Sequence, residues 1–292
     1  MRHLFCLVCS LLLSCMAYGE KITFAGQLIY GGQSIESLSL SDGQWKILEV
    51  YPDLSVDEVS EINEHQVLVS AYLFSKNISE LFIYDLASNT LIPFRPGSRG
   101  IYIPKHHKIV FYHRGKLLIS DMNGSPESLE VIDTAANAYP MSVVPISADV
   151  FLYESERSGT HGIWQHDMVL GEAVELPNLK YCSLSHAIWR VNTQQLLCSE
   201  LSESESHYTG RYVFTDLNGE NKQFIDFGEG EFWPVIYLAH LDAVVLQERA
   251  ASLFKGEYHP VYIYQFADST KTKVDENNML NRRVAYLADK NG

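Results

Sequence analysis

The sequence predicts an all-β protein, a six-bladed β-propeller whose blades are four-stranded antiparallel sheets. Three observations predict this fold class: a β-rich unit recurs along the chain, helical patterns are missing, and the two ends of the chain complement each other. The unit recurs every 36 to 49 residues, which is typical of propeller blades. No stretch alternates apolar and polar residues with a sustained 3.6-residue period, so little helix is expected.

The most regular part of the unit is an apolar strand, a polar residue, a turn and a second strand. It is clear in LFIYDLASNTLIPF, where the polar residue is Asp85, and in YVFTDLNGENKQFI, where it is Asp216. The polar residues of the six copies are Asp42, Asp85, Asp121, Asp167, Asp216 and Gln265. Ahead of this pair we expect a first strand near the central axis. A second strand follows it, rich in Val, Leu, Phe and Tyr because both of its faces are buried.

The first unit lacks its first strand, and the C-terminal segment supplies one. Residues 282–292, RRVAYLADKNG, repeat the Val-x-Tyr-Leu-Ala pattern of residues 235–239, which belong to the first strand of another unit. We therefore expect residues 282–292 to pair with residues 27–32, QLIYGG. The first and last segments would then share one blade and leave the ring without a free edge.

The period, the element Ile83-Tyr84-Asp85 with its echoes at Ile163-Trp164 and Val213-Phe214, and SERSG at residues 155–159 carry a family resemblance. This arrangement resembles the TolB-like six-bladed β-propellers, also called WD40-like repeat propellers. The family's Ser-Pro-Asp-Gly turn is replaced by ADKNG and HLDA, so no subfamily is assigned. The resemblance implies a platform for protein interactions. Some related propellers are lyases or parts of peptidases, and the fold alone does not choose between these functions.

The N-terminal segment, residues 1–19, is expected to be a signal peptide. Arg2 precedes a short apolar run, and Ala17-Tyr18-Gly19 fits the small-x-small rule for cleavage, which would leave a single propeller domain over residues 20–292. Two alternatives remain: lipidation at Cys15 of the LLSC sequence, or an uncleaved segment. Cleavage predicts a periplasmic or secreted protein, whereas lipidation predicts an envelope anchor. No later segment is long and apolar enough to span a membrane.

Two cysteines remain after the signal segment, Cys182 and Cys198, in an oxidising compartment where a disulfide is favoured. A tight turn around residues 192–193 would place Cys198 opposite Ala187 instead of Cys182. Five residues of strand span about 16 Å, beyond the roughly 7 Å between Cα atoms that a disulfide tolerates. Only a loop that folds Cys182 back would join the two, and the pairing stays open at this point.

Long connections between second and third strands distinguish units four to six, at residues 154–162, 200–210 and 248–260. A histidine stands just before each third strand, and aromatic residues lie among the polar ones. The candidate binding residues are His161, His207, His259, Tyr208, Phe254 and Tyr258. Because neighbouring blades would hold these histidines about 10 Å apart or more, we expect separate side chains instead of a metal site, and no other cofactor.

The preferred function is a protein-binding or scaffold module that uses this face of units four to six, where loops on a rigid scaffold usually bind. The net charge of −14 argues against a nucleic-acid partner. A lyase or hydrolase acting on a sugar or peptide at the mouth of the axial channel is the alternative, although no nucleophile elbow, P-loop or HExxH motif occurs. A lipid-anchored structural protein of the envelope is the third hypothesis. Catalytic residues are not identified, and the protein partner is not named by the sequence.

Overall fold

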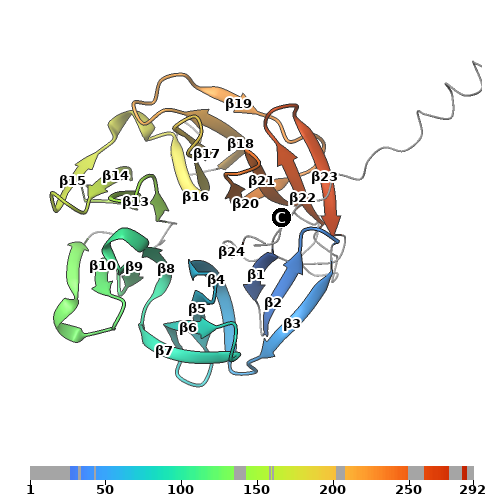
Figure 1. The fold of residues 1–292 in the computed structure, drawn as a ribbon. Coiled ribbons are helices and arrows are strands. Elements are labelled where there is room, and N and C mark those ends of the chain that lie inside the picture. Colours follow the sequence, from blue (N-terminus) through green and yellow to red (C-terminus); the bar gives the residue numbers. More distant parts are fainter. Residues whose placement is uncertain are drawn as a thin grey trace, which may run out of the picture.

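The computed structural model is a ring of six four-stranded antiparallel sheets around a central axis (Figure 1). It describes residues 27–31, 34–42, 44–134, 143–157, 159, 161–201, 208–248, 260–275 and 285–287. The helical segments of these residues are three single 3-10 turns: η1 (Pro104–His106), η2 (Pro126–Ser128) and η3 (Pro177–Leu179). In the same part of the chain, no helix has the length and apolar character needed to cross a membrane.

Each blade runs from an innermost first strand to an outermost fourth strand. Blades one and two contain β24 (Ala285–Leu287), β1 (Gln27–Gly31), β2 (Ser34–Ser39), β3 (Trp45–Val50), and β4 (Leu54–Asn63), β5 (Gln66–Leu73), β6 (Ile78–Asp85), β7 (Thr90–Pro96). Blades three and four contain β8 (Ser98–Ile103), β9 (Lys108–His113), β10 (Lys116–Asp121), β11 (Glu130–Asp133), and β12 (Val144–Pro145), β13 (Val150–Ser155), β14 (Gly162–Asp167), β15 (Glu172–Glu175). Blades five and six contain β16 (Cys182–Arg190), β17 (Gln195–Leu201), β18 (Tyr208–Thr215), β19 (Gln223–Ile225), and β20 (Phe232–Leu238), β21 (Ala243–Glu248), β22 (Val261–Gln265), β23 (Thr270–Asp275).

Ring closure by the two ends of the chain is confirmed. Strand β24 pairs with β1 in an antiparallel ladder that places Tyr286 opposite Leu28 and Ala285 opposite Ile29. Blade one is thus built from the C-terminal strand on the inside and three N-terminal strands outside it (Figure 1). The ladder satisfies the backbone groups at the inner edge of β1, which would otherwise be exposed.

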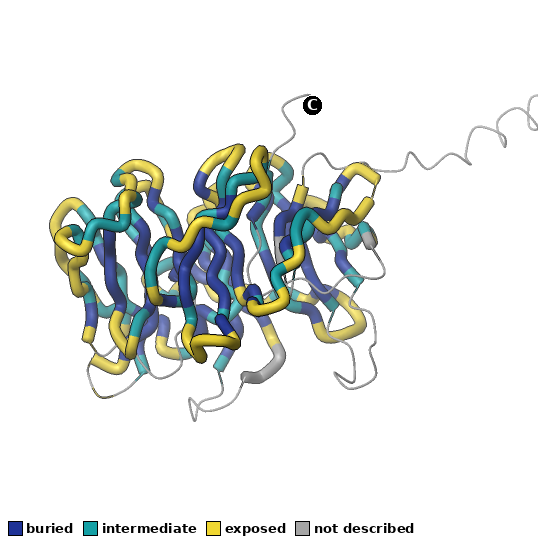
Figure 2. The backbone as a smooth tube through the Cα atoms, turned by 90° about the horizontal axis from the view of Figure 1, so that it is seen from below, coloured by how far each residue is buried: buried dark blue, intermediate teal, exposed yellow. Residues whose placement is uncertain are grey.

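The hydrophobic core is divided into six clusters, each lying between two neighbouring blades. Successive side chains of a strand point to opposite faces, so β5 sends Val67 and Val69 towards blade one and Leu68 towards blade three. Figure 2 shows the result, with buried strands in the middle of the ring and exposed connections on its two faces. The continuous apolar runs of the second strands follow from this burial on both sides.

The recurring Asp at the end of the third strand shapes the turn into the fourth strand. Asp85 Oδ1 accepts hydrogen bonds from the backbone N–H groups of Ala87 and Ser88, at 3.1 and 2.9 Å. Asp167 Oδ1 does the same with two N–H groups of its own turn, at 2.8 and 3.1 Å. A carboxylate bonded to the backbone two and three residues onward is a common turn device, which explains why the residue repeats with the blades.

The structure joins Cys182 and Cys198 in a disulfide, with Cα atoms 5.6 Å apart. The register near the turn is the expected one, because Ile188 pairs with Leu197 and would be followed by Ala187 opposite Cys198. Instead the ladder shifts, and residues 184–187 bulge out of β16 before Ser183 pairs with Ser199. The bulge shortens the path along β16 enough to bring Cys182 beside Cys198, as the folding-back alternative requires.

Candidate functional site

The second-to-third-strand connections lie on the face where first strands begin and second strands end. Of the predicted contact residues, His207, Phe254, Tyr258 and His259 lie outside the described residues. Tyr208 is described by its backbone alone, as the first residue of β18, opposite Leu201 of β17. The contact role of these five residues therefore stays a prediction.

His161 is the predicted site residue that the structure describes fully, and it lies next to a buried acid. Its Nε2 atom is 3.8 Å from Oε1 of Glu154, the fifth residue of β13. Glu154 is 5% exposed, and its Oε1 also accepts a 2.6 Å hydrogen bond from the backbone N–H of Leu184 in blade five. The carboxylate thereby links the connection of blade four to the bulge that carries the disulfide.

Glu154 belongs to a buried polar cluster at this end of blades two to four, formed by Glu58, Arg99, Tyr112, Glu154 and His161. Glu58 is 2% exposed, and its Oε1 is 3.9 Å from Nη1 of Arg99, which begins β8 with a left-handed φ of 54°. Several polar atoms of the cluster have no hydrogen-bond partner among the described residues: both carboxylate oxygens of Glu58, Oε2 of Glu154 and the hydroxyl of Tyr112. Such atoms are rare in folded proteins and mark places where water, an ion or a ligand is bound.

Burial dominates the electrostatics of this polar cluster. Desolvation raises the pKa of Glu154 to about 6, although the nearby charge of His161 and the hydrogen bond from Leu184 act in the opposite direction. Desolvation also raises the pKa of the Tyr112 hydroxyl, and the charge of Glu154 adds to the effect. A carboxyl with a pKa near 6 exchanges a proton at neutral pH, as a general acid or base must.

The described residues contain no group of three or more His, Cys, Asp or Glu side chains arranged to hold a metal ion. Arg99 lies between carboxylates instead and supplies the positive charge that a metal would provide. The polar cluster can therefore accept and release a proton and hold a small polar ligand.

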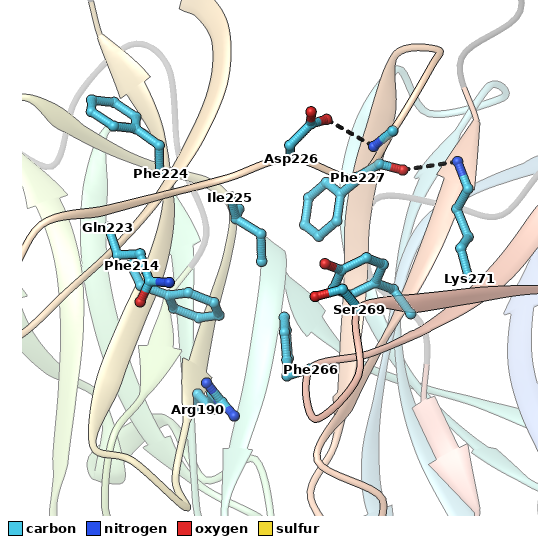
Figure 3. Close-up of a pocket in the computed structure, with 12 residues that line it drawn as sticks. Arg190, Phe214, Gln223, Phe224, Ile225, Asp226, Phe227, Phe266, Ser269 and Lys271 are labelled. Carbon is cyan, nitrogen blue, oxygen red and sulfur yellow. Dashed lines mark hydrogen bonds between the residues drawn. The ribbon is translucent and has the colours of Figure 1, made fainter.

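A larger concave site lies between blades five and six, which we call the blade five–six cleft (Figure 3). It has a volume of about 530 Å³ and is lined by Arg190, Phe214, Gln223, Phe224, Ile225, Asp226, Phe227, Gly228, Tyr264, Phe266, Ser269 and Lys271. Strand β19 and the segment after it form one wall, and the turn between β22 and β23 forms the other. Aromatic rings from both blades meet here because each blade must cover the apolar face of its neighbour.

Two cations stiffen the blade five–six cleft. Arg190 stacks 4.5 Å from the ring centre of Phe266 and 5.4 Å from that of Phe214, and its Nε donates a 2.7 Å hydrogen bond to Asp242. Lys271 donates a 2.8 Å hydrogen bond to the carbonyl of Phe227 across the cleft, as Figure 3 shows. Both cations already have partners, so the cleft does not offer a free positive charge to an anionic ligand.

A second hollow of about 460 Å³ continues from the cleft towards the long connections, on the other side of residues 224–228. Phe224 lines both hollows and is 53% exposed, and Arg211 stacks 4.6 Å from its ring centre. Arg211 also pairs with Glu200, near the end of β17, at 2.5 Å. Exposed aromatic surface therefore lies close to the ends of the connection that carries His207.

Sequence reasoning did not find the blade five–six cleft or most of the polar cluster. The cleft residues Phe214 and Phe266 stand at equivalent places, beside the polar residue that ends each third strand. That shared position was visible in the sequence, but their mutual contact at 5.1 Å depends on how the two blades pack. Glu58 and Arg99 carry no motif, and the tertiary structure alone brings them together.

No family model and no curated protein matches the sequence. Solved structures do match: a chain from a nidogen/laminin complex has a TM-score of 0.67 and 10% identity, over 90% of this chain and 98% of that one. TolB from Acinetobacter baumannii has a TM-score of 0.66 and 11% identity, over 90% of this chain and 67% of its own. An oligogalacturonate lyase in complex with manganese has a TM-score of 0.51 and 12% identity, over 86% and 74%. At these identities the likeness concerns the fold, which is that of TolB-like six-bladed propellers.

Proposed function

We propose that this chain, with the fold of TolB-like propellers, is a periplasmic or secreted protein that binds a protein partner on blades four to six. The observation that carries the proposal is the blade five–six cleft with its neighbouring hollow, where Phe224 is half exposed beside the long connections. An aromatic side chain on a rigid rim can bury a large apolar area in a partner at little entropic cost. A similar propeller chain occurs in a nidogen/laminin complex, which is consistent with such a role.

Substitution of aromatic residues tests the proposal. The variants are Phe224→Ala in the cleft and Tyr208→Ala, Phe254→Ala and Tyr258→Ala on the connections. Partner proteins are first captured from periplasmic extract with the wild-type chain, identified, purified and titrated by surface plasmon resonance. Phe224→Ala and at least one connection variant should weaken binding about tenfold, because a buried aromatic anchor contributes more than 1.4 kcal/mol.

Ile92→Ala is the matched control, since Ile92 is 51% exposed on the outer strand of blade two, away from the cleft. It should bind as the wild type does. If all the aromatic variants bind the captured partner with unchanged affinity, the contact surface is elsewhere and the proposal is wrong.

The compartment is tested by the mature N-terminus. Mass spectrometry of the secreted or periplasmic protein should find Glu20 as the first residue, as cleavage after Gly19 requires. A lipid on Cys15 would instead support the envelope-anchored alternative. The disulfide between Cys182 and Cys198 is consistent with either extracytoplasmic location.

An enzyme remains the second candidate function because of the polar cluster. Arg99 and Glu154 combine a fixed positive charge with a carboxyl whose pKa is near 6, the pair of groups that proton abstraction beside a substrate carboxylate needs. Elemental analysis of the purified protein discriminates cheaply, since a stoichiometric transition metal would favour the enzyme. In that case Glu154→Gln should abolish turnover and leave partner capture intact.

A further inference from the structure

A separate cavity lies on the ring axis, at the end opposite the long connections. Its volume is about 290 Å³, and all six innermost strands line it. One lining residue from each of these strands is Glu61, Tyr102, Pro145, Trp189, Tyr237 and Ala285. Most of these residues stand near the C-terminal ends of their strands, which fixes the cavity at the face of the first-to-second-strand turns. Figure 1 shows the inner strands converging around this axis.

Glu61 is the one charged side chain among the described residues that line this axial cavity. Its carboxylate makes no hydrogen bond or ion pair with another described residue. The side chain faces solvent, yet the surrounding walls desolvate it enough to raise the pKa of its carboxyl. A carboxylate in this position favours any cation that can enter beside it.

The aromatic rings of the cavity are held in place from outside it. The hydroxyl of Tyr237 donates a 2.7 Å hydrogen bond to Asp242, which in turn binds Arg190. The hydroxyl of Tyr102 lies 2.9 Å from Nδ1 of His107. Because these polar tips already have partners at the rim, the rings present apolar surface to the cavity and lose little freedom when a ligand enters.

We propose that the axial cavity binds a small organic cation of the quaternary or methylated ammonium class, with Glu61 as its counter-charge and Tyr102, Trp189 and Tyr237 as its aromatic walls. Aromatic faces attract such cations through their quadrupole, and Trp does so most strongly. The cavity is at the lower end of the range of about 300 to 1,000 Å³ that is usual for ligand pockets, which suits a small ligand. The net charge of −14 concentrates cations around the molecule.

Other ligand classes fit the cavity less well. A metal ion requires several oxygen or nitrogen ligands, and the described lining has a single carboxylate. An anion would be repelled by Glu61. A neutral apolar ligand would strip water from that carboxylate without replacing its interactions, which costs free energy. The ammonium ion of a quaternary amine satisfies both the charge and the apolar walls.

Choline and its neutral isostere 3,3-dimethylbutan-1-ol are the probes for isothermal titration calorimetry of the full mature chain, because they differ in charge and hardly in shape. Choline should bind at least tenfold more tightly than the alcohol. Glu61→Gln should remove that difference while leaving the melting temperature unchanged. Trp189→Leu should weaken choline binding about fivefold or more, in line with the strength of a desolvated cation–aromatic contact.

Glu172→Gln is the matched control, since Glu172 is exposed on the outer strand of blade four and its loss removes the same charge from the molecule. It should bind choline as the wild type does. The proposal is overturned if choline gives no saturable heat at millimolar concentration, if the two probes bind equally, or if Glu61→Gln binds choline normally. None of these results depends on the protein-binding proposal, because the cavity and the blade five–six cleft share no residue with the substituted positions.

Discussion

Deletion of residues 282–292 removes β24 and tests whether the ring closes as the structure shows. Three residue pairs join β24 to β1, and such a ladder contributes about three backbone hydrogen bonds of about 1 kcal/mol each. The deletion also uncovers Leu28 and Ile29, which are 0% and 1% exposed. Uncovering one aliphatic side chain's worth of surface costs about 2 to 3 kcal/mol more.

The expected loss is therefore about 5 kcal/mol, a large part of the roughly 5 to 15 kcal/mol by which a folded domain is usually stable. Thermal denaturation followed by circular dichroism should show a melting temperature lower by more than about 10 °C, or aggregation through the open edge of β1. Urea titration followed by tryptophan fluorescence gives the free energy of unfolding directly.

Two further variants separate the ladder from chain length. Deletion of residues 288–292 alone leaves β24 in place and should change the melting temperature little. Ala285→Asp keeps every residue but buries a charge in the core between blades one and two, where Ala285 is 1% exposed, and should destabilise the protein strongly. A chain that lacks residues 282–292 and melts at the wild-type temperature would refute the closure.

Three other predictions concern single contacts. Reduction of the Cys182–Cys198 bridge, which closes a loop with a sequence separation of 16, should lower the free energy of unfolding by about 3 kcal/mol; an unchanged urea midpoint with and without dithiothreitol would contradict this. Burial raises the pKa of Glu154 from 4.5 to about 6, so the folded protein holds a proton that the unfolded chain releases in that window. Stability should thus be highest below pH 4.5 and fall by about 2 kcal/mol as pH rises through 6, a component that Glu154→Gln removes when the two pH profiles are subtracted. Asp167→Ala should cost about 1 kcal/mol in urea denaturation because two turn N–H groups lose their acceptor, whereas Asp167→Asn keeps an acceptor and should cost less.

Local patterns were sufficient to predict the blades. The third strand, its terminal Asp and the following turn are close in sequence, so LFIYD around Asp85 identifies them without knowledge of distant residues. Closure by β24 was also predictable, because a unit that lacks a first strand at one end and a spare first strand at the other can be recognised by counting. The length of β12, described over two residues, was less predictable from the segment of residues 140–147.

The disulfide shows where local reasoning stops. The expected register near Ile188 is correct, but the register shift that follows depends on residues 184–187 packing against blade four, including the bond from Leu184 to Glu154. His186 within this bulge takes a left-handed φ of 60°, which no sequence pattern indicated. Pairing of Cys182 with Cys198 is thus decided by contacts between blades.

The sequence by itself determined the fold class, the number of blades and the way the ring closes, because these follow from periodicity and from the alternation of side chains within single strands. Only the tertiary structure decided which side chains meet: Glu58 with Arg99, Phe214 with Phe266, and Glu61 among the rings on the axis. Each of these groups comes from more than one blade, so its geometry depends on how neighbouring sheets pack around the ring. Packing between blades joins residues that are far apart in the chain, and no local period records it.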